Sequence, residues 1–224
     1  MADLSLQRHN MVESQVRPSD VTDRRILRAM ADIPREAFIE PERRALAYLD
    51  IDLPISARGA PSTPGRAMLA PRTFAKLVQL AAIEPTDIVL DVGCATGYST
   101  AILARLAQTV VALENDPKLA AEATRTLQSL GVDNAAVVEG PLNAGYPSEG
   151  PFDVIVVEGA VSEVPAALLG QLNDGGRLVA ILADRVPSRG AVWRRTGTTT
   201  AHRDAFDAAA PILPGFEKKP GFVF

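Results

Sequence analysis

The chain has 224 residues, of which 47% are hydrophobic and 22% charged, and its net charge at pH 7 is −4. This composition is typical of a globular protein with a substantial core, and the acidic balance argues against a nucleic-acid or anionic-membrane surface. One cysteine (Cys94) and two distant histidines (His9 and His202) exclude a disulfide framework and argue against a metal site. No apolar run resembles a signal core or a membrane span, so we expect a cytoplasmic protein.

Residues 1–60 are predicted to be helical, because they show no strand pattern. Asp20 is a candidate N-cap for a helix that ends before Pro34 and buries one apolar stripe, formed by Val21, Ile26, Leu27 and Met30. A short helix is expected at residues 41–48. Residues 51–64 contain three prolines and a glycine and are predicted to form a loop. Such a loop is either a wall of a substrate site or a surface connection, and composition alone favours neither.

A helix at residues 71–81 leads into residues 87–98, around which the rest of the chain is organised. Residues 88–92 are mostly apolar and β-branched, as in a strand that is buried on both faces. Gly93 and Gly97 follow, in a turn that opens a helix at about residues 96–99. In an open α/β sheet, ligands bind at this end of a strand, so the turn is the candidate cofactor site.

The turn lacks the marks of a phosphate site. Ala95 stands between Gly93 and Gly97 where a dinucleotide fingerprint could have another glycine, and no P-loop lysine follows. The next strand, residues 109–114, ends at Glu114, where an acid binds a ribose diol in this class of fold. Together these features favour a nucleoside without phosphates, such as S-adenosylmethionine, over a turn that is glycine-rich only for packing. Cys94 is interpreted as a small residue that suits the turn, since no histidine is near it in sequence.

Alternating elements continue to the end of the chain. After a helix capped by Asp116, strands are expected at 135–139, 153–157 and 177–182, with a helix at about 165–172 and an antiparallel pair at 191–195 and 198–203. This order predicts an α/β fold with a doubly wound, mostly parallel seven-stranded sheet. We expect one domain, with a helical segment and loop over 1–65, a nucleoside-binding core over 66–185, and antiparallel strands and a tail over 186–224. The apolar residues of the tail are expected to pack back on the domain: Phe206, Ile212, Leu213 and Phe216.

From about residue 11 to residue 182, the motifs and their order resemble the protein-L-isoaspartate O-methyltransferase family. The resemblance is carried by Arg28-Ala-Met-Ala-Asp-Ile-Pro-Arg-Glu-Ala-Phe38, Leu90-Asp-Val-Gly-Cys-Ala-Thr-Gly-Tyr98 and Pro151-Phe-Asp-Val-Ile-Val-Val157. It implies a Rossmann-like methyltransferase fold, S-adenosylmethionine as methyl donor, and an isoaspartyl or other carboxylate of a protein or peptide as acceptor. An acceptor carboxylate is ionised at neutral pH, so the chemistry needs placement and exclusion of water rather than a general base. The implied cofactor contacts are Asp91, Gly93, Cys94, Ala95, Gly97, Glu114, Asn115, Gly140, Pro141 and Leu142.

Three positions depart from the pattern of the family. Leu69 stands where the family has a hydroxyl, an acid that meets adenine is replaced by Gly140-Pro-Leu142, and Glu158 replaces a small residue. Leu69, Arg66 and Glu158 are the candidate acceptor-site residues. Glu158 would repel an anionic acceptor unless Arg66 or Arg72 paired with it.

Three functions are therefore compatible with the sequence. They are an isoaspartyl repair methyltransferase or a member of that family with weak activity, a methyltransferase of the same fold with another acceptor, and a non-catalytic nucleoside-binding or scaffold homologue. An NAD oxidoreductase is disfavoured because the middle glycine of the dinucleotide fingerprint is missing.

Overall fold

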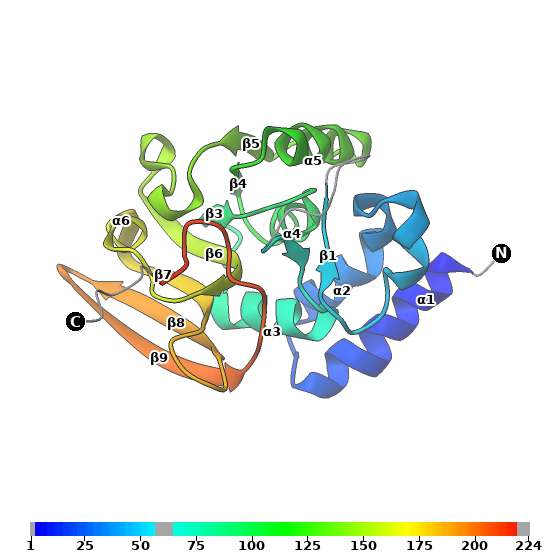
Figure 1. The fold of residues 1–224 in the computed structure, drawn as a ribbon, viewed down its shortest axis with the longest axis horizontal. Coiled ribbons are helices and arrows are strands. Elements are labelled where there is room, and N and C mark those ends of the chain that lie inside the picture. Colours follow the sequence, from blue (N-terminus) through cyan, green and yellow to red (C-terminus); the bar gives the residue numbers. More distant parts are fainter. Residues whose placement is uncertain (1–2, 57–64, 219–224) are drawn as a thin grey trace, which may run out of the picture.

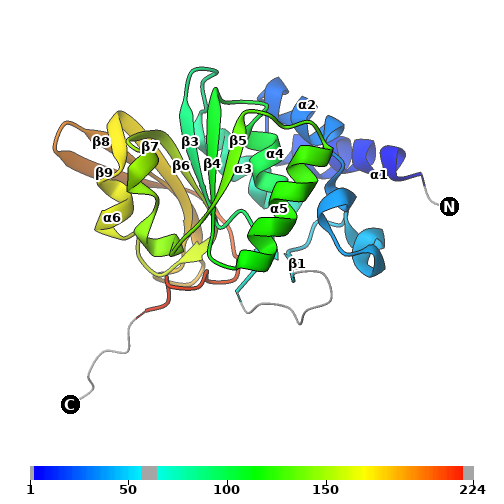
Figure 2. The ribbon, with the colours of Figure 1, turned by 90° about the horizontal axis from the view of Figure 1, so that it is seen from above.

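The computed structural model describes residues 3–56 and 65–218. Seven strands form one sheet in the order β5-β4-β3-β6-β7-β8-β9, and helices cover both faces (Figures 1 and 2). Strands β3 to β7 are parallel, and β8 and β9 are antiparallel to their neighbours. The predicted mostly parallel seven-stranded sheet is confirmed. The strands are β3 Ile88–Val92, β4 Thr109–Glu114, β5 Ala135–Glu139, β6 Phe152–Val161, β7 Leu172–Leu182, β8 Arg189–Thr196 and β9 Thr199–Asp207.

Each face of the sheet buries its own apolar cluster. In β3, Val89 belongs to the cluster that contains Phe74, and Leu90 belongs to the opposite cluster, with Leu168. Successive side chains of a strand point to opposite faces, so a strand covered on both sides needs apolar residues at consecutive positions. Helices α3 (Pro71–Ala81), α4 (Tyr98–Leu103) and α5 (Pro117–Ser129) cover the first face, and α6 (Ala166–Leu169) covers the second.

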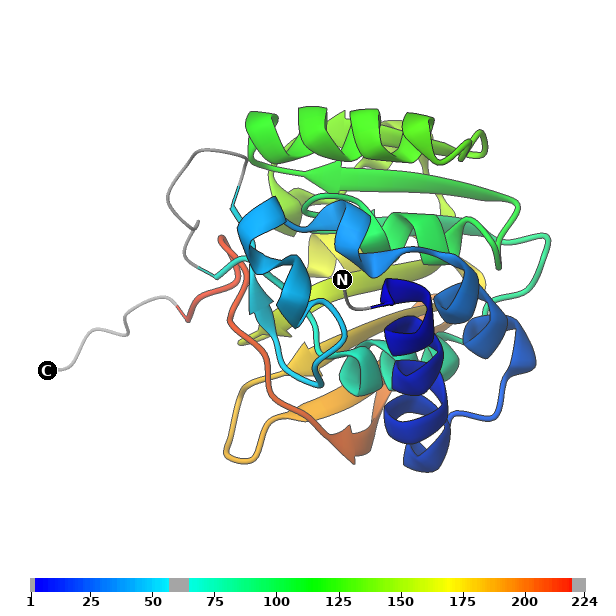
Figure 3. The same ribbon diagram turned by 90° about the vertical axis from the view of Figure 1, so that its right-hand side faces the viewer.

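The N-terminal segment packs beside α3 and α4 and is helical, as expected (Figure 3). It contains α1 (Leu4–Met11) and α2 (Arg24–Asp32), whose predicted stripe is buried. The prediction that Asp20 caps α2 was wrong. Asp20 has a left-handed backbone with φ of 65°, whereas Asp23 is extended and its carboxylate accepts the Arg25 N–H at 2.8 Å. Within the described residues, no helix is long and apolar enough to cross a bilayer.

The loop predicted at residues 51–64 lies partly outside the described residues. Its described part forms β1 (Leu53–Pro54), which pairs antiparallel with β2 (Ala67–Met68). Before it, the helix expected at residues 41–48 is a short 3-10 helix over Pro41–Leu46. The pairing of β1 with β2 brings the chain on either side of this loop to one place, beside the carboxyl ends of the central strands (Figure 2).

Several boundaries in the second half of the sheet differ from the prediction. Strand β6 continues to Val161 and β9 to Asp207, each four residues beyond its predicted end. The helix expected at 165–172 ends at Leu169, because β7 already begins at Leu172, which pairs with Phe152. The pairing of β6 with β7 shifts register between this point and Arg177, where Gly175 is left-handed. The strand predicted at 177–182 is therefore only the second half of β7.

The C-terminal tail returns over the carboxyl edge of the sheet (Figure 1). Ala160 N donates to Pro211 O, and Leu213 N donates to Ala160 O, both at 2.9 Å. Leu213 and Phe216 are buried, as expected, while Ile212 is 36% exposed. The tail thus adds a short parallel bridge at the end of β6, above the turn that follows β3.

Candidate nucleoside and acceptor site

The glycine turn lies at the centre of the carboxyl edge, between β3 and α4. Gly93 and Gly97 have φ of 85° and 97°, and Ala95 between them has φ of 50°. These left-handed dihedrals suit glycine and are uncommon for alanine. Gly93 N donates to Leu113 O at 2.8 Å, which holds the turn against the end of β4.

Asp91, the last acid of β3, anchors the start of α4. Its Oδ2 accepts the hydroxyls of Ser99 and Thr100 at 2.8 and 2.7 Å, while its Oδ1 has no partner among the described residues. Burial raises the pKa of Asp91 to about 6, although the two hydroxyl donors act in the opposite direction. Burial likewise raises the pKa of the Cys94 thiol, so this cysteine is suited to packing in the turn and not to nucleophilic attack.

Glu114 lies where the sequence places a ribose-binding acid, but its carboxylate is fully used by the protein. Its Oε1 accepts the backbone N–H groups of Asn115 and Asp116 at 2.9 and 3.1 Å. Its Oε2 accepts the Ala95 N–H at 2.8 Å and a hydrogen bond from Arg66 Nη2. A carboxylate has about four lone-pair sites, so no acceptor position is left for a ribose hydroxyl.

Arg66, which precedes β2, forms a buried ion pair with Glu114. The two side chains are 1% and 0% exposed. The guanidinium lies over the glycine turn, because a Cβ built on Gly93 would be 3.0 Å from Arg66 Nη1. The same Cβ would be 3.3 Å from Leu213 Cδ1 of the tail. Arg66 and Leu213 therefore fill the space that the glycine leaves above the turn.

Glu158 and Leu69 line one small cavity beside this ion pair. Its volume is about 20 Å³, which is room for about one water molecule. Leu69 is 2% exposed and lines the cavity with an apolar side chain. Cys94, Tyr98 and Arg35 line other parts of its wall.

Glu158 pairs with neither of the two arginines that the sequence offered as partners. Arg66 pairs with Glu114, and Arg72 lies near the surface, 3.2 Å from Asp50. The Oε1 atom of Glu158 is buried and has no hydrogen-bond partner in the described part of the chain. Burial, and then the charge of Asp91, raises the pKa of Glu158 well above its usual range.

The predicted adenine side of the site lies farther along the edge, after β5. Gly140 N donates to Glu114 O at 3.0 Å, and Leu142 is buried in the cluster of the second face. Pro141 and Asn115 are exposed. These residues therefore border Glu114, but the apolar Leu142 offers no polar group to a base.

Arg35 is a buried residue of this region to which the sequence alone assigned no role. Its Nε donates to Ala47 O at 2.8 Å, its Nη2 donates to Leu69 O at 2.7 Å, and its guanidinium lies 4.8 Å from the ring centre of Tyr98. The position of Leu69 thus depends on a residue 34 positions earlier. Only its place in the Pro-Arg-Glu-Ala-Phe segment could have drawn attention to it.

Comparison with known proteins assigns the chain to a family. Residues 6–195 match the family model of protein-L-isoaspartate(D-aspartate) O-methyltransferase. The chain belongs to this family. A protein-L-isoaspartate O-methyltransferase from Herpetosiphon aurantiacus is 36% identical to it over 197 residues, which are 85% of each chain. One from Koribacter versatilis is 40% identical over 175 residues, which are 78% of this chain and 76% of the relative.

Solved structures of protein-L-isoaspartate O-methyltransferases share the fold. One has a TM-score of 0.78 at 24% identity and covers 94% of this chain and 66% of its own. Another, a Plasmodium falciparum protein in complex with S-adenosyl-L-homocysteine, has a TM-score of 0.75 at 19% identity and covers 92% of this chain and 97% of its own. The family, the methyltransferase class and the methyl donor predicted from the sequence are confirmed at the level of the family.

In the described residues, Arg66 and three backbone N–H groups occupy the acceptor positions of Glu114 that a ribose diol would use. The glycine turn and Glu114 have the required chemistry, since one allows close approach and the other is an acid at the end of the second strand. However, the hydrogen bond from Arg66 takes the last acceptor position of Glu114. A nucleoside could bind Glu114 only after Arg66 had moved.

Proposed function

We propose that the chain is an S-adenosylmethionine-dependent methyltransferase that acts on a carboxylate of a protein or peptide, and that it methylates isoaspartyl residues slowly. The observation that carries the proposal is the family match over residues 6–195. It is supported by the glycine turn and Glu114 at the expected edge of the sheet. A cytoplasmic location, and the lack of nucleic-acid, membrane and metal partners, stay predictions from the sequence.

Two side chains support slow transfer to an isoaspartyl group. Leu69 and Glu158 line the same cavity, one apolar and one acidic. A carboxylate that approaches Leu69 gives up a hydrogen bond to water and gains none, which costs roughly 1–3 kcal/mol. An ionised Glu158 would add repulsion between like charges.

The test is incorporation of a tritiated methyl group into an isoaspartyl peptide, with the matching aspartyl peptide as control. We expect incorporation that depends on the isoaspartyl linkage and is at least about tenfold slower than that of the Herpetosiphon relative. Rates equal to those of the relative would contradict the argument from Leu69 and Glu158. Absence of both methyl transfer and S-adenosylhomocysteine binding would contradict the methyltransferase assignment itself.

A non-catalytic homologue is the second candidate, because the Arg66–Glu114 ion pair closes the ribose position. Calorimetric titration with S-adenosylhomocysteine separates the two candidates. A methyltransferase must bind S-adenosylhomocysteine, the product that its donor becomes on losing the methyl group, whereas a scaffold protein that keeps Arg66 on Glu114 gives no heat of binding.

A further inference from the structure

Two buried groups near Gly93 have unused hydrogen-bonding capacity. Arg66 donates through Nη2 to Glu114, but its Nε has no acceptor among the described residues. Glu158 lies in β6, one residue after Val157, which pairs with Val92 of β3, and its Oε1 has no donor among the described residues. Buried polar atoms without partners are destabilising. Arg66 has a donor without an acceptor and Glu158 has an acceptor without a donor, so a bond between them would satisfy both.

We propose that Arg66 is an internal occupant of the ribose position, and that it moves from Glu114 to Glu158 when a nucleoside binds. The proposal rests on the proposed function, since the nucleoside is that of the methyl donor. It assigns a joint role to Arg66 and Glu158 in setting the affinity for the donor.

Competition for Glu114 is the first step of the argument. The carboxylate already accepts three backbone N–H groups and Arg66, and the backbone donors belong to the turn and to the start of α5. A ribose diol needs acceptor positions on the same carboxylate. Only the bond from Arg66 comes from a side chain that can rotate away, so Arg66 is the group that a ribose displaces.

The displaced guanidinium needs another buried carboxyl that can ionise beside it, because an unpaired buried charge is strongly unfavourable. Burial raises the pKa of Glu158, so this carboxyl would release its proton to solvent as Arg66 arrives. Glu158 lines the cavity beside the glycine turn and has a free oxygen, and the charge of Arg66 already lowers its pKa against the effect of burial. Asp91 is a poorer destination for the guanidinium, because its Oδ2 already accepts hydrogen bonds from Ser99 and Thr100. Its side chain also does not line the cavity. Gly93 has no side chain to obstruct the guanidinium between the two carboxylates.

The test is calorimetric titration of S-adenosylhomocysteine into the full chain and into Arg66→Gln, Glu158→Gln and the double variant. We expect Arg66→Gln to bind S-adenosylhomocysteine at least about tenfold more tightly. In this variant no ion pair has to break before Glu114 is free to bind the ribose. Glu158→Gln is expected to bind about tenfold more weakly, because Arg66 loses its second partner. In the double variant the effect of Glu158→Gln should disappear, which is the mark of coupled residues.

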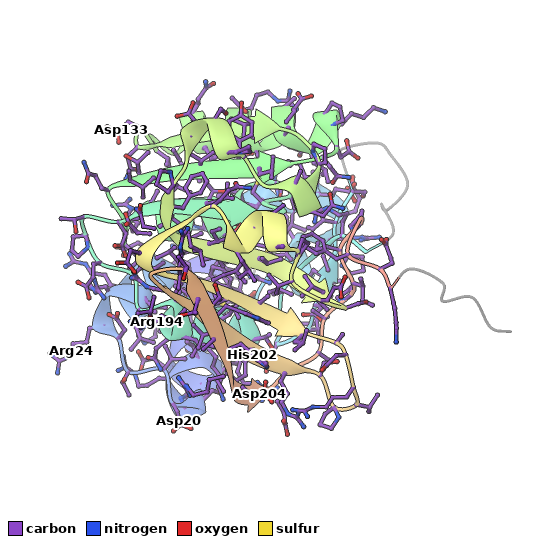
Figure 4. All side chains as sticks on the ribbon, turned by 90° about the vertical axis from the view of Figure 1, so that its left-hand side faces the viewer. Asp20, Arg24, Asp133, Arg194, His202 and Asp204 are labelled. Carbon is purple, nitrogen blue, oxygen red and sulfur yellow. The ribbon has the colours of Figure 1, made fainter. Side chains whose placement is uncertain are left out.

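Arg24→Gln is the matched control, because Arg24 is exposed on α2 and points away from the molecule (Figure 4). Its affinity is expected to equal that of the unmodified chain. If Arg66→Gln does not fold, Arg66→Lys replaces it, with a smaller gain in affinity expected. A second readout is the NMR signal of the Arg66 Nε–H group, which should shift on addition of S-adenosylhomocysteine in the unmodified chain and not in Glu158→Gln.

Three results would overturn the proposal. Equal affinities of the unmodified chain and Arg66→Gln would show that Arg66 does not compete, while leaving the proposed methyltransferase function intact. An equal effect of Glu158→Gln with and without Arg66 would show that Glu158 does not receive the guanidinium. No binding by any variant, including a folded Arg66 variant, would contradict both this proposal and the proposed function.

Discussion

A buried carboxyl without a partner affects folding stability as well as binding, and Glu158 is such a group. Its pKa is raised in the folded protein, chiefly by burial and then by Asp91, while Arg66 and Arg35 act in the opposite direction. The folded state therefore holds a proton that the unfolded state loses at lower pH. The contribution of Glu158 to the free energy of unfolding therefore falls as pH rises from the pKa of Glu158 in the unfolded chain, near 4.5, toward its higher pKa in the folded protein.

We accordingly expect Glu158→Gln to be more stable than the unmodified chain at pH 8, and expect this advantage to shrink toward pH 5. Gln keeps the shape of the neutral acid and cannot ionise. Asp91, with its pKa of about 6, also titrates between these pH values in both proteins, and its charge contributes to the raised pKa of Glu158 in the unmodified chain. Urea midpoints at the two pH values measure the difference, and a pH-independent difference would show that Glu158 does not titrate in this range.

Leu69 and Glu158 line one cavity, and we expect the two side chains together to determine how fast an isoaspartyl peptide is methylated. The double change Leu69→Ser with Glu158→Thr should increase methyl transfer to an isoaspartyl peptide. The gain should exceed that of either single change, and the two effects should not be additive, since both side chains act on one carboxylate. The measurement is the rate of tritiated-methyl incorporation for the four proteins. Simple additivity would mean that the two residues act on different groups.

At the scale of elements, the tail closes the site through one side chain. Leu213 is fully buried, and its Cγ would lie 2.6 Å from a Cβ built on Gly159 and its Cδ1 3.3 Å from one built on Gly93. Leu213→Ala should lower the free energy of unfolding by about 2–5 kcal/mol, as for other buried leucines. Ile212→Ala, at a residue that is 36% exposed, is the matched control and should cost less. Thermal or urea unfolding measures both, and equal losses would show that the tail is not packed through Leu213.

Elements with strong local patterns could be predicted from the sequence. The β3 strand and the glycine turn were expected from consecutive apolar residues and two glycines, and the structure has them at Ile88–Val92 and Gly93 to Gly97. Boundaries that depend on pairing were not predictable in this way. The early start of β7 follows from its contact with β6 at Phe152, and the cap of α2 depends on the left-handed backbone at Asp20.

In the candidate site, too, the position of a residue in a strand was predictable from the sequence, whereas its contact with a residue far away in the chain was not. Glu114 was placed correctly at the end of β4 because the strand pattern ends there. Its pairing with Arg66 was not predictable, because the two residues are 48 positions apart and meet only when β2 reaches the edge of the sheet. No local pattern indicates which of several carboxylates a distant arginine will reach.

At the scale of the molecule, the N-terminal segment and the sheet share one core. Apolar residues of the segment, such as Met11 and Ile26, belong to the same buried cluster as Val89 and Val154 of the sheet. Two polar contacts reinforce this packing, since Thr96 Oγ1 donates to Phe38 O at 2.7 Å and Arg35 Nη2 donates to Leu69 O at 2.7 Å. A shared core of this kind predicts that the segment and the sheet unfold together.

Trp193 allows this to be tested, because it is the only tryptophan in the chain and lies in β8, far along the sheet from the N-terminal segment. Its ring is 8% exposed and stacks on His202, which lies on the β8–β9 ribbon (Figure 4). In urea, tryptophan fluorescence and far-UV circular dichroism should therefore give the same midpoint. Separate midpoints would mean that the segment unfolds on its own.

Arg35→Ala should destabilise both signals together. The substitution leaves the carbonyls of Ala47 and Leu69 without their buried donor, at roughly 1–3 kcal/mol each, so a loss of about 2–6 kcal/mol is expected. The exposed Arg24→Ala is the matched control and should change the free energy of unfolding by less than about 0.5 kcal/mol. If Arg35→Ala lowered the midpoint of the helical signal but not that of Trp193, the N-terminal segment would be a separate folding unit that docks on the sheet. A common shift of both signals would instead show that the N-terminal segment and the sheet, with the cavity at Leu69 between them, unfold as one unit.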